Sequence, residues 1–173
     1  MRLKHAKTLV TGKPGVGKTT LVQRIIERVG PVPMAGFYTA EVRSGGSRLG
    51  FEICGLDGKR RTLAHVDIRS RHRVGKYGVD TDGFEAFLET LDLLNPDAAL
   101  IVIDEIGKME LFSTAFRSLV RDALNSDREV LATIPWKGDK FIQDIKRRTD
   151  IRLFEVTAEN RDRLPGDIVE GWS

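Results

Sequence analysis

The sequence lacks several features that would assign the chain to a special class of protein. Cys54 is the only cysteine among 173 residues, so no disulfide can form within the chain. No apolar run approaches the length of a membrane span, and we expect no membrane partner. The charged residues at positions 1–5 are not followed by the apolar stretch of a signal peptide. These absences predict a cytoplasmic protein.

Internal repeats, low-complexity segments and linkers are also missing, so we predict a single domain over residues 1–173. With 28 basic and 25 acidic residues, the net charge is only +3. This small excess suits an anionic ligand. It does not favour nucleic acid, because no base-stacking aromatic residues alternate with the basic ones. Nothing in the sequence identifies a protein partner.

One stretch stands out in what remains, because residues 12–19 fit the pattern G-x-x-x-x-G-K-[ST]. The stretch lies between a predicted strand at 7–10 and a predicted helix at 20–29, which is the context that the pattern needs. Glycines let the backbone curl around a phosphate and point successive N–H groups at it. The predicted nucleotide-binding residues are Gly12, Lys13, Pro14, Gly15, Val16, Gly17, Lys18, Thr19 and Thr20.

Two side chains of this loop carry chemistry. Lys18 brings a full positive charge to the outer phosphates, and we predict that it is catalytic. Thr19 offers a hydroxyl group that can bind Mg²⁺. The loop therefore predicts a bound nucleoside triphosphate, but it does not say what happens to that ligand.

The second half of the predicted site follows a continuous apolar run at residues 98–103, which ends in Asp104 and Glu105. Such a run is typical of a central parallel strand that is covered on both faces. Ligands lie at the carboxyl ends of such strands, so we expect Asp104 beside the loop as a Mg²⁺ ligand. We expect Glu105 to orient and deprotonate a water molecule that attacks the γ-phosphate.

Other residues are weaker candidates. Lys108 either contacts a phosphate or is a plain surface lysine. Thr133 ends the next predicted strand, where related ATPases carry a polar residue that senses the γ-phosphate. The aromatic residues Phe37, Tyr38 and Phe51 either pack on the sheet or flank the nucleotide base.

Apolar strands alternate with amphipathic helices, which predicts an α/β fold with a mostly parallel sheet flanked by helices. Residues 36–43 and 48–56, separated by a glycine turn, predict an antiparallel hairpin region added to that sheet. Asp82 is the predicted N-cap of a helix at 84–94. The basic residues 59–76 are interpreted as a solvated loop, with the alternative that one of their arginines reaches the phosphates as a finger.

Together these motifs resemble the small P-loop nucleoside-triphosphatases of the thermophile and human cancer-related types. The resemblance covers nearly the whole chain, and it is most specific in the block at residues 102–112. It also rests on residues 12–20, 36–39, 41–43, 74–77, 79–80, 132–135 and 159–162. The resemblance implies a RecA/AAA-like sheet and Mg²⁺-dependent hydrolysis of nucleoside triphosphates (ATP, GTP, CTP and UTP) with weak discrimination among bases.

Three alternative functions stay open. Residues 104–107 fit D-x-x-G and residues 136–139 nearly fit the guanine motif [NT]-K-x-D, which favours a GTPase except that Trp136 occupies the first position. A small-molecule nucleotide kinase suits the chain length, but the pair of Asp104 and Glu105 speaks against it. In a binding module, the nucleotide would serve only as a switch.

Overall fold

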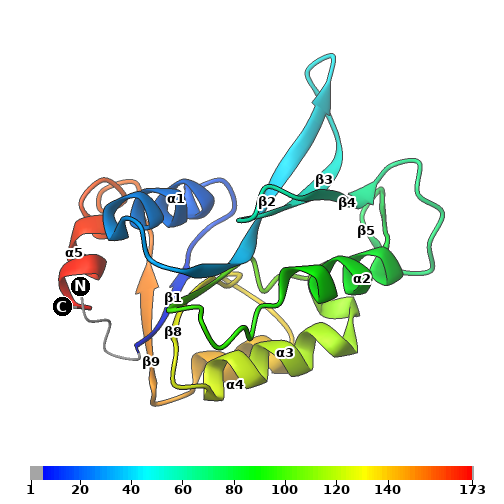
Figure 1. Cartoon of the computed structure of the whole chain (residues 1–173). Helices are drawn as coiled ribbons and strands as arrows, with labels where there is room; N and C mark the ends of the chain where they lie inside the picture. Colours follow the sequence, from blue (N-terminus) through cyan, green and yellow to red (C-terminus); the bar gives the residue numbers. More distant parts are fainter. Residues whose placement is uncertain (1–5, 173) are drawn as a thin grey trace.

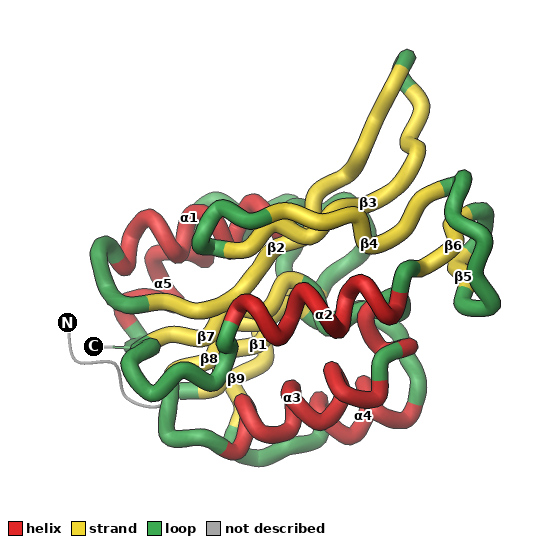
Figure 2. The backbone as a smooth tube through the Cα atoms, turned by 45° about the vertical axis from the view of Figure 1, so that its right-hand side comes forward, coloured by secondary structure: helices red, strands yellow, loops and turns green. Residues whose placement is uncertain are grey.

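The computed structural model describes residues 6–172, so positions 1–5, where we sought a signal peptide, lie outside the described residues. The described strands form one sheet with helices on both faces (Figures 1 and 2). The strands are β1 (Lys7–Thr11), β2 (Met34–Ser44), β3 (Ser47–Gly55), β4 (Arg60–His65), β5 (Arg73–Val74), β6 (Tyr77–Val79), β7 (Leu100–Asp104), β8 (Glu129–Thr133) and β9 (Ile151–Glu155). The helices are α1 (Lys18–Val29), α2 (Thr81–Leu91), the 3-10 turn η1 (Glu110–Phe112), α3 (Thr114–Asn125), α4 (Lys140–Lys146) and α5 (Leu164–Glu170).

The strand order is β5-β6-β4-β3-β2-β7-β8-β1-β9. The strands from β2 to β9 in this order pair in parallel, and the others pair antiparallel. β2 belongs to both regions, because its first residues pair with β7 and the rest of its length pairs with β3. The predicted α/β fold, with a parallel core and an added hairpin region, is confirmed. One domain over the whole chain stays a prediction.

Both faces of the parallel strands are buried. α1 and α5 cover one face, and α2, α3 and α4 cover the other (Figure 2). In β7, Leu100 and Val102 face the core under α1 and α5, whereas Ile101 and Ile103 face the other core. The continuous apolar run of β7 therefore reflects burial on both sides. Among residues 6–172, no helix is both long and apolar enough to cross a bilayer.

The predicted N-cap of α2 is wrong by two residues. Asp80 caps the helix, because its Oδ1 accepts a hydrogen bond from the backbone N–H of Gly83 at 3.0 Å. Asp82 lies in the first turn. Glu85 does not complete a capping box with Asp82, since its Oε1 accepts a hydrogen bond from the Ser113 hydroxyl at 2.5 Å.

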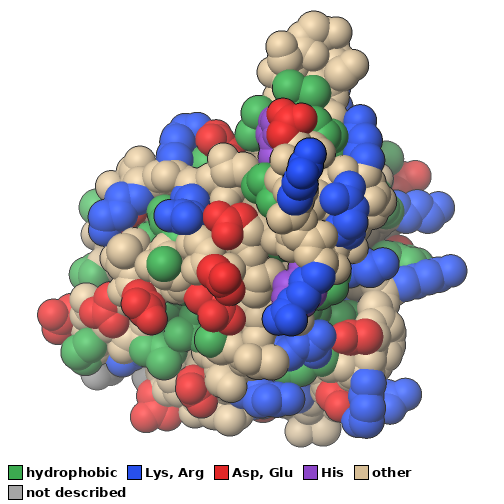
Figure 3. All heavy atoms as spheres, turned by 90° about the vertical axis from the view of Figure 1, so that its right-hand side faces the viewer, with side chains coloured by type: hydrophobic (Ala, Val, Ile, Leu, Met, Phe, Trp, Pro, Cys, Tyr) green, Lys and Arg blue, Asp and Glu red, His purple; other side chains and the backbone are tan. Residues whose placement is uncertain are grey.

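The interpretation of residues 59–76 as a solvated loop is wrong for β4 and β5. Within β4, Leu63 and Ala64 are buried against the core, and the exposed arginines before them hid the strand pattern. Some of these arginines are paired, as in the contacts of Arg60 with Glu52 at 2.6 Å and of Arg61 with Asp80 at 3.3 Å. Basic side chains on this side of the molecule are accordingly interspersed with acidic ones (Figure 3).

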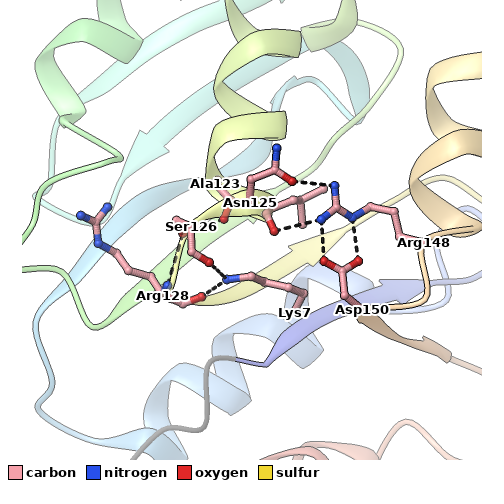
Figure 4. Close-up of polar contacts among 8 residues, drawn as sticks. Lys7, Ala123, Asn125, Ser126, Arg128, Arg148 and Asp150 are labelled. Atoms are coloured by element: carbon pink, nitrogen blue, oxygen red, sulfur yellow. Dashed lines mark hydrogen bonds and ion pairs between the residues drawn. The ribbon is translucent and has the colours of Figure 1, made fainter.

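A polar network closes the amino-terminal ends of β1 and β8 (Figure 4). Lys7 is 5% exposed, and its Nζ donates hydrogen bonds to the carbonyl oxygens of Ser126, at 2.7 Å, and of Arg128. Arg148 holds Asp150 beside them with contacts of 2.8 and 2.6 Å. This network fixes β1 at the end opposite to its loop.

The replacement Lys7→Met should lower the free energy of unfolding by about 1–3 kcal/mol, because two carbonyl oxygens lose their donor. Urea unfolding measures this difference. The control is Lys140→Met, since Lys140 is exposed and pairs only with Asp144; it should change stability by less than about 0.5 kcal/mol. Equal losses in the two variants would show that the Lys7 network contributes nothing specific.

Candidate active site

The loop at residues 12–20 connects β1 to α1, and two of its glycines have backbone conformations that other residues rarely adopt. Gly15 has φ of 76°, and Gly17, the N-cap of α1, has φ of 107°. Since α1 begins at Lys18, the unpaired N–H groups of its first turn open toward the loop. The Lys18 Nζ donates a hydrogen bond to the Gly12 carbonyl oxygen at 3.2 Å, which holds the ammonium group over the loop.

Asp104 ends β7, and β8 alone separates β7 from β1 in the sheet. The side chain is 2% exposed, and its Oδ1 accepts a hydrogen bond from the Thr133 hydroxyl at the end of β8. Burial raises the pKa of the Asp104 carboxyl, while the hydroxyls of Thr133 and Thr19 and the charge of Lys18 act in the opposite direction. Thr133 therefore orients the carboxylate of Asp104.

The second carboxylate oxygen of Asp104, Oδ2, is buried and has no hydrogen-bond partner among the described residues. A buried polar atom without a partner is costly unless a ligand or ion supplies one. Residues 6–172 contain no cluster of three or more acidic, histidine or cysteine side chains that would hold a metal by itself. A single carboxylate beside the Thr19 hydroxyl fits Mg²⁺, which takes few protein ligands and completes its shell with phosphate oxygens and water.

Glu105 follows Asp104 through a cis peptide bond and is half-buried. Burial raises the pKa of its carboxyl group, the positive charge of Lys18 lowers it, and the negative charge of Asp104 raises it. A carboxylate whose proton affinity is increased by burial is a better acceptor for a proton from water.

These side chains line one cavity of about 670 Å³ at the carboxyl edge of the parallel strands. The predicted site residues that line this cavity are Gly12, Pro14, Gly15, Gly17, Lys18, Thr19, Thr20, Asp104 and Glu105. Lys13 and Val16 belong to the loop but do not line the cavity, and Val16 packs against the core under α1. The structure thus brings the loop and the acidic pair together.

Other lining residues were missed or left open by the sequence. Thr39 and Glu41 come from β2, Phe51 comes from β3, and Trp136 and Lys137 follow β8. Phe51 was one of the aromatic residues named as an alternative for base contact, whereas Phe37 is fully buried in the core. The segment after β8 was detectable in principle, because consecutive parallel strands end at the same edge of a sheet.

A second cavity, of about 560 Å³, adjoins the first and shares Glu105, Pro135 and Lys137 with it. Lys108 lines this second cavity rather than the first. Glu105 therefore stands between two solvent-accessible spaces.

The basic residues at positions 69–76, one of whose arginines was the alternative candidate for a finger, lie away from these cavities. β5 is the last strand at one end of the sheet, six strands from β8 and seven from β1. Arg69, Arg71 and His72 line a separate hollow of about 290 Å³, and Arg73 and Lys76 line neither cavity beside Glu105. The structure does not bring any of these five residues to the loop at 12–20.

Glu110 is a buried acid that we did not single out as a site residue. It lies on η1, is 4% exposed, and has a pKa raised to about 8. The main cause is burial, and the negative charge of Glu105 adds to it, while hydrogen bonds from the backbone at Glu110 and Gly107 act in the opposite direction. Glu110 therefore keeps its proton below about pH 8.

Comparisons with known proteins agree with this geometry. A family model described as NTPase matches residues 7–169. The chain is 43% identical over 167 residues to the nucleoside-triphosphatase THEP1 of Thermotoga sp. (strain RQ2), with 94% of this chain and 93% of that protein covered. It is also 43% identical over 176 residues to the cancer-related nucleoside-triphosphatase of Homo sapiens, with 92% of this chain and 93% of the human protein covered.

Two solved structures are similar over nearly the whole chain. The crystal structure of THEP1 from the hyperthermophile Aquifex aeolicus has a TM-score of 0.87 at 39% identity, with 96% of this chain and 99% of that one covered. The solution structure of a human cancer-related nucleoside triphosphatase has a TM-score of 0.82 at 41% identity, with 96% of each chain covered. The resemblance predicted from the motifs is confirmed.

The raised pKa of Glu110 predicts a pH-dependent stability. Between pH 4.5 and about 8 the folded state holds a proton that the unfolded state has released, so the free energy of unfolding falls as pH rises through this window. Glu110→Gln cannot ionise and loses this dependence. Relative to the wild type, it should gain a few kcal/mol between pH 5.5 and pH 9, since each pKa unit corresponds to about 1.4 kcal/mol.

Urea unfolding at several pH values measures the difference in the free energy of unfolding between the wild type and Glu110→Gln. The contributions of the other buried acids to this difference cancel because both proteins contain them. Glu27→Gln, at an exposed position on α1, is the control. A Glu110→Gln difference that stays constant with pH would contradict the assignment of a raised pKa.

Proposed function

This chain belongs to the NTPase family, the nucleoside-triphosphatases, and on that premise we propose that it hydrolyses ATP, GTP, CTP and UTP to the diphosphate and phosphate, with Mg²⁺ bound and Glu105 as the general base. The observation that carries the proposal is the presence, around one cavity, of an anion-binding loop and an acidic pair. The loop can hold the phosphates, and the acidic pair can hold a metal and activate water.

The loop determines the direction in which the triphosphate lies. In this motif the backbone N–H groups bind the α- and β-phosphates, and the lysine reaches the β- and γ-phosphates. Lys18 and Glu105 interact electrostatically across the cavity, so the γ-phosphate belongs on their side. The nucleoside then extends the other way, past Thr20 at the start of α1.

Asp104 and Thr19 are the residues that would hold Mg²⁺. The buried Oδ2 of Asp104 lacks a partner, and Thr19 lies close enough to stabilise the ionised carboxylate. When bound, the metal supplies positive charge to the phosphate oxygens. Thr133 keeps Asp104 oriented through Oδ1, which leaves Oδ2 for the metal.

In the proposed reaction, the oxygen of a water molecule attacks the γ-phosphorus and forms a new P–O bond. The bond between the γ-phosphorus and the β–γ bridging oxygen breaks, and the diphosphate leaves with that oxygen. Glu105 accepts the proton of the water, and Lys18 stabilises the negative charge on the phosphate oxygens. This division of roles needs no arginine from residues 59–76.

The nucleotide base would contact a small groove of about 150 Å³ that adjoins the loop at Gly17 and Thr20. Gly17, Thr20, Leu21, Arg24 and Arg161 line it. The Arg161 side chain is exposed and has no ion pair or hydrogen bond to any described residue, whereas Arg24 pairs with Asp162 at 2.9 Å. A guanidinium group stacks on the face of any base, so this groove suits broad base specificity.

The alternative functions are less well supported by the geometry. In the near match to the guanine motif, Asp139 is already engaged: its Oδ1 caps α4 at Ile142, and its Oδ2 pairs with Arg117 at 3.0 Å. It lines the second cavity and not the groove beside Thr20. A kinase must keep water away from the γ-phosphate, whereas Glu105 borders two open cavities.

We also propose that the protein is cytoplasmic. Cys54 is the single cysteine of the sequence and is buried as a free thiol, which suits a reducing compartment. Nucleic acid is not a proposed partner. In the antiparallel region, Glu52 and Asp80 pair with Arg60 and Arg61 and so offset the positive charge that would attract nucleic acid.

The replacement Glu105→Gln should reduce kcat for ATP by about 10²-fold or more while leaving triphosphate binding nearly unchanged, because the amide cannot accept the proton of water. Lys18→Ala should abolish turnover and also weaken binding. Phosphate release and equilibrium binding of a non-hydrolysable ATP analogue measure the two effects separately. Wild-type turnover by Glu105→Gln would exclude Glu105 as the base.

The four triphosphates should have kcat/KM values within about tenfold of one another, a spread of roughly 1.4 kcal/mol in transition-state stabilisation. Arg161→Ala should raise KM for all four to a similar extent, about fivefold for the loss of about 1 kcal/mol of stacking. Arg163→Ala, at another exposed arginine of the same segment, is the control and should leave KM unchanged. A preference for GTP of a hundredfold or more would instead favour a GTPase.

A further inference from the structure

Glu110 is a buried carboxyl group that the proposed hydrolysis does not use. It is 4% exposed, and it comes five residues after Glu105, at the start of η1. Acidic side chains are almost never fully buried unless they are paired, so a role for this one is expected.

Gly107 shows how close the two glutamates lie. A Cβ atom placed on Gly107 would be 2.6 Å from Oε1 of Glu105 and 2.7 Å from Oε2 of Glu110. Both carboxyl groups therefore lie close to the same point, and a side chain at position 107 would displace one or both of them. Gly107 is itself buried, so no solvent layer separates the pair at this point.

The segment that carries Glu110 is fixed by backbone hydrogen bonds. The N–H of Ile106 donates to Thr133 O at the end of β8 at 2.9 Å, and the N–H of Leu111 donates to Gly107 O at 3.0 Å. Ser113, directly after η1, is buried and caps α3. Glu110 therefore stands on a rigid support that is tied to the sheet and to α3.

Glu105, by contrast, has no such support of its own. No hydrogen bond or ion pair joins its carboxylate to another side chain in residues 6–172, and the charges of Lys18 and Asp104 act on it. A general base must be held near its working position to be effective. The carboxyl groups of Glu105 and Glu110 both lie close to the space beside the Gly107 Cα, so Glu110 is a buried side chain placed to act on the Glu105 carboxylate.

We propose that Glu110 is a positioning residue for Glu105: from the buried side of Gly107, its carboxyl group determines where the Glu105 carboxylate stands relative to the attacking water. The inference rests on the proposed role of Glu105 as the base. Glu110 does not touch substrate and acts only through Glu105.

The positioning of Glu105 should depend on whether Glu110 is ionised, because of the charges around Glu110. The acidic groups that act on it are Glu105 and Asp104, and the backbone at Gly107 and Glu110 hydrogen-bonds to it. A neutral carboxyl group presents no net charge to Glu105, whereas an ionised one repels it. Glu110→Gln keeps the size and neutrality of the protonated side chain, and Glu110→Ala removes the support.

Steady-state phosphate release from ATP with Mg²⁺ tests the proposal. At pH 7, Glu110→Ala should lower kcat about tenfold or more with KM within about twofold, and Glu110→Gln should keep at least about half of the wild-type kcat. Above pH 8, the wild type should lose activity that Glu110→Gln retains. Glu89→Ala, at an exposed glutamate on α2, is the control and should match the wild type throughout.

A double-mutant cycle separates positioning from general damage. If Glu110 acts through Glu105, adding Glu110→Ala to the Glu105→Gln variant should cost less than about twofold in kcat, because the base is already lost. An additional tenfold loss in that background would overturn the proposal. So would wild-type kcat in Glu110→Ala, or a Glu110→Gln variant as impaired as Glu110→Ala at pH 7.

If Glu110→Ala fails to fold, Gly107→Ala gives the second test. Its methyl group would meet the Glu105 and Glu110 side chains, so kcat should fall with KM little changed. Unchanged kcat in this variant would overturn the proposal. The Glu105→Gln variant distinguishes a failure of the proposed function from a failure of the positioning role. Wild-type kcat in Glu105→Gln would exclude Glu105 as the base and so remove the proposed function. A reduced kcat in Glu105→Gln together with wild-type kcat in Glu110→Ala would remove only the positioning role.

Discussion

The parallel pairing of β1, β8 and β7 is the constraint on which the site depends. Parallel strands end at a common edge, so the loop after β1 and the acidic pair after β7 meet although about ninety residues separate them in the sequence. β8 lies between the two strands and contributes Thr133, which orients Asp104. A shift of β7 by one residue would exchange the faces of all its side chains and place Asp104 elsewhere, so the site depends on the observed register of β7 with β8 and β2.

The site concentrates acidic groups where a polyanion is expected to bind. Burial raises the pKa of Asp104, Glu105 and Glu110, and among residues 6–172 Lys18 is the one cation that acts on the first two. A triphosphate brought into this cavity alone would meet repulsion from the acidic pair. A divalent cation on Asp104 would convert part of that repulsion into attraction, which agrees with the unpartnered Oδ2. Protonation of Glu110 removes one further negative charge near neutral pH.

Local patterns were sufficient to predict the loop, β7 and the acidic pair. Lys18, Asp104 and Glu105 each stand in a short motif whose chemistry can be inferred without tertiary contacts. Phe51 and Trp136 reach the cavity only through the pairing of distant strands, which no local pattern encodes. Glu110 could be located in the motif block, but its burial depends on the turn at residues 106–109 and on the packing of η1. In α2, Asp82 was predicted as the cap because Glu85 lies three residues later, as in a capping box, but Glu85 accepts a hydrogen bond from Ser113 and Asp80 caps the helix.

The antiparallel region is part of the site and not an appendage to it. β2 pairs with β7 along Met34–Tyr38 and then continues beyond the carboxyl end of β7 while pairing with β3 (Figure 1). Because β2 extends beyond the end of β7, the residues of β2 after Tyr38 lie beyond the sheet edge where Asp104 is found. Thr39 then donates a hydrogen bond to the Asp104 carbonyl oxygen at 3.1 Å, and Glu41 and Phe51 form a wall of the cavity. A parallel core alone would leave this side of the acidic pair open to solvent. The extension therefore covers one side of the cavity that contains Asp104 and Glu105, which links the antiparallel strands to the site.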